Sequence, residues 1–348
     1  MDRRALVRDP RARHDALMAP EHLRKLLGDI PAPVLLASPA VADGIDESLR
    51  YLASDEALAS IAADTYRPKW NSPWWHMLLL HELGEAGRIP QRAVRAMMEG
   101  LARLRIHVFP VRPEDTPPGA DSYRDSLCHC ALGSMTQLLT ACGVDVGTAL
   151  PWTVPWFARY QMPDGGLSCD NSAYLVADEC PSSMVGTVAP FEAVLDGALS
   201  EERRLFLTRA AGFLVARRLV LGSPTKHNAD ERTSAPAWRL PCFPRFYFYD
   251  VLRGTSALVR WALVSGEAIP LAGVSLAAMH LARAYPDGVI RIGRRVRRLD
   301  HPPACERRLG ATAGVPVRAA RRDERRGRTV PDADAPLERR APRPDRAD

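Results

Sequence analysis

Apolar residues recur along most of this chain at the spacing of amphipathic helices. In the segments 73–83, 91–104 and 246–264 they return every three or four residues, which places them on one face of a helix. Strict alternation of apolar and polar residues, which marks a half-buried strand, is nearly absent. The pattern predicts an all-α protein without a convincing sheet.

Prolines and capping residues divide the helical segments into pairs. Ser72 and Pro73 provide a cap and a first-turn proline for one helix. Four prolines in 108–120 predict a loop, after which Asp121 or Ser122 caps the next helix. Helices are predicted over 1–30, 44–65, 73–83, 91–104, 121–141, 148–161, 181–195, 201–219, 246–264 and 270–284.

A unit of about 45–50 residues, a helix pair followed by a longer connection, repeats along the chain, as in solenoids and closed helical arrays. We therefore divide the chain into an N-terminal helical extension (1–43), a repeat domain (44–300) and a C-terminal tail (301–348). Arg, Pro, Asp and Ala dominate the tail, which has almost no aromatic or large aliphatic residue. Because such a segment buries too little apolar surface to fold, the tail is predicted to be disordered.

The charge distribution bears on possible partners. The formal net charge is +6, and basic residues crowd the end of the chain from Arg294 onward. This basic run has no interleaved aromatic residues, which a single-strand binder uses for base stacking. No nucleic-acid partner is therefore expected. No transmembrane segment is expected either, because no apolar run approaches the ~18–20 residues of a membrane span.

The cysteines and the N-terminus indicate a compartment. Seven cysteines occur at irregular spacing. Residues 1–9 carry mixed charge and lack the apolar core of a secretory signal. These features predict a cytoplasmic protein whose cysteines are reduced thiols or metal ligands and do not form a disulfide framework.

One segment carries a family signature. Residues 157–167 read Phe-Ala-Arg-Tyr-Gln-Met-Pro-Asp-Gly-Gly-Leu. This resembles the repeat signature of the prenyltransferase and squalene-cyclase superfamily: an aromatic residue, three residues, Gln, three residues, Gly, one residue and an aromatic residue, here replaced by Leu167. Gln161, near a helix end, is predicted to bond backbone groups of the turn, while the glycines let the chain reverse. One full repeat, about 122–170, matches well, and the stretches 174–196 and 246–264 match more weakly.

The resemblance implies an α/α toroid, a ring of helix pairs around a central cavity. The inner helices would be 73–84, 122–141, 181–195 and 246–264, with their N-terminal ends at one mouth of the cavity. Aromatic rings there would suit an isoprenoid chain or its carbocations, because a ring face stabilises a cation by ~0.5–2 kcal/mol. The same rings could instead fill an ordinary core. The candidate lining residues are Trp74, Trp75, Tyr247, Phe248 and Tyr249.

The resemblance also implies a zinc site. Asp178 and Cys180 fall about where the zinc-binding Asp-x-Cys of protein prenyltransferases lies relative to the glycine turn. Zinc takes thiolate and carboxylate ligands and keeps one position open in catalytic sites. In that family a histidine completes the ligands, but the corresponding stretch 246–250 has none. Cys242 or Cys169 would have to substitute.

A second thiol and imidazole cluster is Cys128-His129-Cys130. Adjacent residues on a helix diverge by ~100°, so all three cannot face one metal ion. Buried cysteine as a small apolar residue is the ordinary alternative. Zinc is therefore the cofactor that the sequence suggests, and its ligand set stays open.

Candidate groups for proton transfer are fewer. The Asp-x-Asp-Asp acid motif of class II terpene cyclases is absent from this sequence, which disfavours a standard cyclase. Asp250, on the aromatic helix, is the best single carboxylate, although it could instead cap that helix or pair with Arg253. His76 and His129 are the other two catalytic candidates.

Two classes of function follow from these residues. The first is a terpenoid- or prenyl-processing enzyme, either an isoprenoid cyclase or a prenyltransferase-like protein. The second is a non-catalytic toroid that binds a lipid or peptide, or a scaffold protein. The sequence leaves the substrate, the oligomeric state and the presence of catalysis open, since a fold alone hosts many functions.

Overall fold

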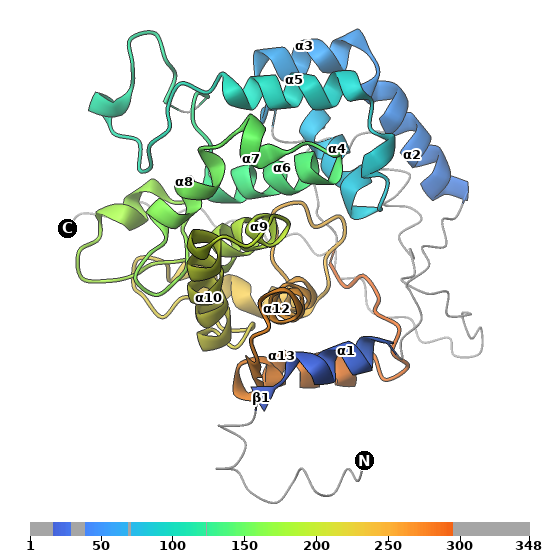
Figure 1. Cartoon of the computed structure of the whole chain (residues 1–348), viewed down its shortest axis with the longest axis vertical. Helices are drawn as coiled ribbons and strands as arrows, with labels where there is room; N and C mark the ends of the chain where they lie inside the picture. Colours follow the sequence, from blue (N-terminus) through green and yellow to red (C-terminus); the bar gives the residue numbers. More distant parts are fainter. Residues whose placement is uncertain (1–16, 29–38, 69–70, 123, 295–348) are drawn as a thin grey trace, which may run out of the picture. The chain divides into compact units, whose positions relative to one another are not determined.

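The structure is a computed structural model that describes residues 17–28, 39–68, 71–122 and 124–294 (Figure 1). All of them belong to one compact unit, which spans Met1–Arg318. The described chain is mostly helical and contains one sheet of two short strands, which confirms the predicted all-α class. The predicted tail at 301–348 and most of the predicted N-terminal extension lie outside the described residues.

The described elements have the following bounds. The α-helices are α1 (Pro20–Gly28), α2 (Pro39–Leu52), α3 (Asp55–Ala63), α4 (Pro73–Glu82), α5 (Gln91–Ala102), α6 (His129–Ala141), α7 (Val146–Ala149), α8 (Thr153–Tyr160), α9 (Met184–Leu195), α10 (Glu201–Ala216), α11 (Asp230–Ser234), α12 (Val251–Ser265) and α13 (Leu271–Ala284). The 3₁₀-helices are η2 (Ala86–Arg88), η3 (Pro113–Asp115), η4 (Asn171–Leu175) and η5 (Ala235–Arg239). Strand β1 (Leu17–Met18) pairs antiparallel with β2 (Ile269–Pro270), with Leu17 opposite Pro270.

Four helices form the centre of this unit. α4, α6, α9 and α12 pack against one another in chain order (Figure 1). Every side chain from His129 to Leu139 of α6 is buried, as is every one from Pro73 to Leu80 of α4. Helices that are apolar on all sides are core elements. These are the four helices predicted to be inner helices, and their closure into a toroid stays a prediction.

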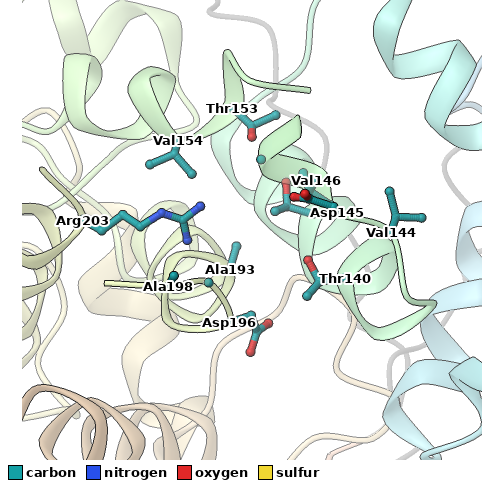
Figure 2. A pocket seen from close by; sticks show the side chains of 13 residues that line it. Thr140, Val144, Asp145, Val146, Thr153, Val154, Ala193, Asp196, Ala198 and Arg203 are labelled. Atoms are coloured by element: carbon teal, nitrogen blue, oxygen red, sulfur yellow. The ribbon is translucent and has the colours of Figure 1, made fainter. Parts of the chain in front are cut away.

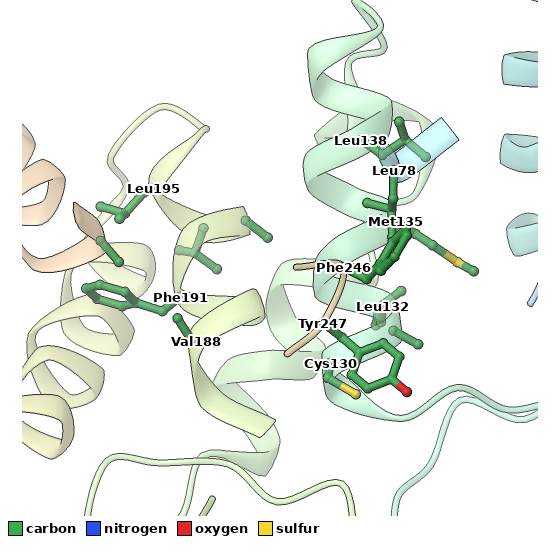
Figure 3. Packing of buried hydrophobic residues seen from close by; sticks show 14 of the residues in the cluster. Leu78, Cys130, Leu132, Met135, Leu138, Val188, Phe191, Leu195, Phe246 and Tyr247 are labelled. Atoms are coloured by element: carbon green, nitrogen blue, oxygen red, sulfur yellow. The ribbon is translucent and has the colours of Figure 1, made fainter. Parts of the chain in front are cut away.

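The other helices cover this core. α2 and α3 pack on α4, and α5 packs on α3. α10 packs on α8, α9 and α12, while α13 packs on α10 and α12. Buried side chains of α4 and α6 lie around Phe246, which comes from the loop before α12 (Figure 3). None of the described helices is long and apolar enough to cross a membrane.

Two predicted helices are divided in the structure. The segment 44–65 falls into α2 and α3, because the Ser54 hydroxyl caps α3 by accepting a hydrogen bond from Ala57 N. The segment 148–161 falls into α7 and α8 around Pro151, which has no N–H to donate and disfavours a helical residue before it. The single long helices predicted at these two places are wrong.

The predicted start of the next inner helix is also wrong. α6 begins at His129, several residues after the predicted cap at Asp121 or Ser122. The intervening side chains bond their own backbone: Asp121 Oδ1 accepts from Arg124 N, and the Ser126 hydroxyl donates to Ser122 O. Such local bonds compete with the helical ones, so the segment forms turns.

The closest approach of α6 and α9 depends on Gly133. A Cβ added there would lie 2.5 Å from Pro190 N and 2.6 Å from the carbonyl carbon of Ala189. We expect Gly133→Ala to destabilise the protein by about 1–3 kcal/mol, because backbone atoms of α9 cannot move aside as a flexible side chain would. Urea unfolding measures the change.

Gly212→Ala is the matched control for this prediction. Gly212 lies inside α10, and a Cβ added there meets no atom within 4 Å. Alanine should therefore stabilise α10 by about 0.5–1 kcal/mol through its helix propensity. Equal effects of the two substitutions would contradict the close packing of α6 on α9.

Candidate metal centre

Three cysteines meet at the N-terminal end of α6. Cys128 precedes the helix, Cys130 lies in its first turn, and Cys169 lies in the loop between α8 and η4. Their three Sγ atoms all lie within 4.8 Å of one another, and those of Cys128 and Cys130 are 3.4 Å apart. Such a cluster of thiols can hold a metal ion.

The start of α6 explains why two neighbouring thiols can converge. Cys128 is the N-cap, with the extended backbone angles φ −76° and ψ 161°, so the 100° spacing of helical side chains does not apply to it. Cys130 is helical, and its backbone N–H donates to the Cys169 sulfur at 3.3 Å. A sulfur in front of a helix N-terminus is in a position that favours the thiolate.

The protonation of the three thiols is linked. Hydrogen bonds from Cys130 and then Cys169 hold the pKa of Cys128 well below its usual range. Hydrogen bonds to Cys128 and Cys130, followed by burial, raise the pKa of Cys169 well above its usual range. One thiolate therefore forms easily, while further ionisation places like charges together in a buried space. A cation bound between the sulfurs would offset that repulsion.

His129 positions the parts of the cluster without joining it. The Trp156 indole N–H donates to Nδ1 at 2.8 Å, so the neutral ring carries its proton on Nε2. Nε2 then donates to the Tyr174 hydroxyl at 3.0 Å, which in turn donates to Tyr160 O. The same hydroxyl accepts from Ser168 N, next to the third cysteine. This network ties the start of α6 to the loop that carries the third thiol.

The structure agrees with the expectation that Cys128, His129 and Cys130 cannot all face one metal ion, because His129 lies outside the three-sulfur cluster. Both ring nitrogens of His129 form hydrogen bonds, one with Trp156 and one with Tyr174, so neither is available to a metal ion. The two thiols nevertheless converge. A catalytic role for His129 stays a prediction.

Burial of His129 makes folding sensitive to acid. Burial lowers its pKa from 6.5 to about 3. Its contribution to stability is complete above pH 6.5, the unfolded value, and is lost as the pH falls toward 3, because the unfolded chain then binds a proton that the folded chain excludes. We expect a loss of about 3 kcal/mol from this residue between pH 7.5 and pH 4.5.

Urea unfolding of the wild type and of His129→Gln at both pH values checks this expectation. The glutamine amide can accept from Trp156 and donate to Tyr174 but does not titrate. The variant should lose correspondingly less stability on acidification. An equal loss in both proteins would mean that another group binds the proton.

The other two catalytic candidates have structural partners. His76 is buried between α2 and α4, where Nδ1 lies 3.2 Å from the Ser48 hydroxyl and the ring lies over Tyr51. Asp250 is fully buried and caps α12: one oxygen accepts from Arg253 N and the other from Cys242 N, both at 2.8 Å. Proton transfer by either residue stays a prediction.

The candidate lining residues form an aromatic cluster between α4 and the loop before α12. Trp74, Trp75, Tyr247 and Tyr249 are buried, and Phe248 is half-buried. Trp74 stacks on Tyr247 with ring centroids 6.4 Å apart, and Tyr247 stacks on Phe248 at 4.6 Å. These contacts are those of a packed core. A role in lining a substrate cavity stays a prediction.

This aromatic cluster adjoins the thiols. Burial raises the pKa of Tyr66, and the charges of Cys128, Cys130 and then Tyr247 add to the effect. The Tyr66 ring also lies 4.9 Å from that of Trp74. Figure 3 shows Cys130 and Tyr247 at the same end of α6. Aromatic side chains therefore lie at the same end of α6 as Cys130.

The other predicted metal ligands lie apart from Cys169. Asp178 is exposed, and the Cys180 sulfur lies 3.9 Å from the Ser182 hydroxyl. Cys242 is buried beside Pro244, and burial raises its pKa to about 11. Among the described residues, Cys169 is the only one of the four that joins the three-sulfur cluster.

The space between the four central helices is small and polar. A cavity of about 20 Å³ lies there, about the room for one water molecule. Beside it Arg253 pairs with Glu192 at 2.7 Å and donates to Phe246 O and Phe248 O. Glu82 accepts from the backbone N–H of Phe246. Charged and polar side chains therefore line this cavity, and a wide aromatic-lined cavity stays a prediction.

The fold and the three thiols define a mostly helical protein with a candidate metal centre. No protein family, no curated protein and no solved structure matches the chain. The function must therefore be argued from the residues of the site.

Proposed function

We propose that this protein binds one zinc ion through the thiolates of Cys128, Cys130 and Cys169. The observation that carries the proposal is the mutual separation of the three sulfurs, at most 4.8 Å. Tetrahedral zinc with Zn–S bonds of about 2.3 Å places its sulfur ligands about 3.8 Å apart. Small side-chain movements would therefore bring all three to the metal.

The ligand set supports zinc among the metals. Thiolates select zinc, Cu(I) and iron–sulfur clusters over the hard cations. Iron–sulfur clusters use four protein ligands, and the described residues supply three here. Zinc accepts three protein ligands and leaves one position for water or substrate.

The chemistry that we propose for this centre is isoprenoid processing. Zinc held by the three thiolates would lower the pKa of a coordinated thiol or water, and its attack on a prenyl diphosphate would form a C–S or C–O bond and release diphosphate. Tyr247 lies at the same end of α6 as Cys130, and its ring would hold an unsaturated chain or its cation. Gln161 also supports the proposal, since it donates to Gly165 O at 2.8 Å and to Phe206 O at 3.0 Å, the backbone bonding expected of that repeat signature.

A second candidate is a non-catalytic protein in which the metal only joins α6 to the loop after α8. The network through His129 favours this alternative, because it already fixes the same two segments. The small polar space between the central helices also favours it. In this case the protein would bind a lipid or peptide or act as a scaffold.

One set of measurements tests both candidates. Purified protein is analysed for metal and then incubated with prenyl diphosphates and with squalene, with and without added zinc. Product that requires zinc and disappears in Cys169→Ser, but not in Cys142→Ser, supports the enzyme. Bound zinc without any product supports the non-catalytic protein. Wild-type protein that does not bind zinc would overturn both. Cys142 is a matched control because it lies at the C-terminal end of α6 and donates to Ala86 O.

A further inference from the structure

A second site lies at the opposite end of α6 from the thiols. A cavity of about 380 Å³ opens between the C-terminal ends of α6 and α9, with α7 and the starts of α8 and α10 as its walls (Figure 2). This volume lies within the range of about 300–1,000 Å³ that is usual for small-molecule pockets. Its apolar walls include Val144, Val146 and Val154.

A guanidinium without an acidic partner extends into this cavity. Arg203, from the first turn of α10, points across it toward α7 (Figure 2). The one hydrogen bond that its guanidinium makes within the described chain, from Nη1 to Val194 O, is long at 3.5 Å. Within the described residues no carboxylate oxygen lies within 4.0 Å of its nitrogens. The planar fork of an arginine matches a ligand carboxylate.

A carboxylate stands opposite the guanidinium. Asp145 accepts from Thr148 N and from the Thr148 hydroxyl, and these bonds, followed by the charge of Arg203, lower its pKa. A Cβ added at Gly147 would lie 3.4 Å from Asp145 Oδ1 and 3.9 Å from Arg203 Nη2. The two charges therefore face each other across Gly147 without forming an ion pair. The other acid of the cavity, Asp196, pairs with Arg260.

We propose that this cavity binds a small zwitterion of the amino-acid class. The ligand carboxylate bonds Arg203, and the ligand ammonium bonds Asp145. The three valines contact the apolar part of the ligand. One positive and one negative group, held apart and unpaired, complement both ends of a zwitterion, whereas a simple anion would meet repulsion from Asp145. The site is independent of the metal centre.

Calorimetric titration of the full chain with each of the common L-amino acids tests the proposal. At least one should bind. Arg203→Gln and Asp145→Asn should each weaken that binding about tenfold or more, since each removes a charged hydrogen bond. Arg204→Gln, at the exposed next position, should leave binding unchanged.

Two analogues of the bound amino acid then test its charge class. The analogue without the ammonium group and the analogue without the carboxylate should each bind about tenfold more weakly. Circular dichroism confirms that the variants are folded, and the two analogues give an answer on the wild type even where a charge substitution disturbs folding. Wild type that binds none of the amino acids at millimolar concentration overturns the proposal. Equal binding of the analogue without the ammonium group, or unchanged binding in Arg203→Gln, overturns it as well.

Discussion

Serine in place of Cys169 is expected to remove the metal from the purified protein and to lower its thermal midpoint by roughly 10 °C. The three sulfurs lie within 4.8 Å of one another. A zinc site with three protein ligands has no spare ligand, so loss of one sulfur should release the metal. Free zinc at about a thousandfold over its dissociation constant stabilises the folded state by about 4 kcal/mol. Each kcal/mol shifts the midpoint by about 2–4 °C in a domain of this size.

Elemental analysis and calorimetry check this expectation together. A chelator added to the wild type should reproduce the lower midpoint of Cys169→Ser, and added zinc should restore it only in the wild type. Cys142→Ser should keep both the metal and the midpoint, since Cys142 lies outside the cluster. Wild type that takes up no zinc, or whose midpoint does not respond to zinc, would contradict the site.

Removal of the Arg253 guanidinium is expected to have a second large effect. Arg253 is 4% exposed, pairs with Glu192 at 2.7 Å and donates to the carbonyl oxygens of Phe246 and Phe248. In Arg253→Met, Glu192 would remain buried as an uncompensated charge, and two carbonyls would lose a donor. Breaking such a pair costs about 3–5 kcal/mol, which urea unfolding measures.

Two further variants make the result specific. The double variant Glu192→Leu with Arg253→Met removes both charges and should recover part of the stability lost in the single variant. Arg260→Met breaks a neighbouring pair, Arg260 with Asp196, whose side chains are 47% and 23% exposed. That change should cost about 1 kcal/mol or less. A loss in Arg260→Met equal to that in Arg253→Met would contradict the role of burial.

The candidate site was predictable in part. Cys169 was among the predicted ligands, and Gln161 makes the turn bonds that its position near a helix end predicts. Cys128 and Cys130 were considered and set aside, because the predicted helix enclosed both of them. Asp121 and Ser126 could have indicated the later start of α6. Their side chains bond nearby backbone groups, and these bonds compete with the hydrogen bonds of a helix.

The sequence by itself predicted the helical class, the main part of the four central helices and the start of α4 at Pro73, but α12 begins at Val251 and not at the predicted residue 246, because Asp250 caps it. These features depend on periodicity and on capping contacts between residues close together in the chain. Only the tertiary structure decided that Cys169 joins Cys128 and Cys130, that Arg253 and Glu192 fill the space between the central helices, and that Arg203 faces Asp145. Each of these contacts joins segments that are distant in the sequence. Which segments meet depends on how whole helices pack, and the local spacing of residues does not encode that packing.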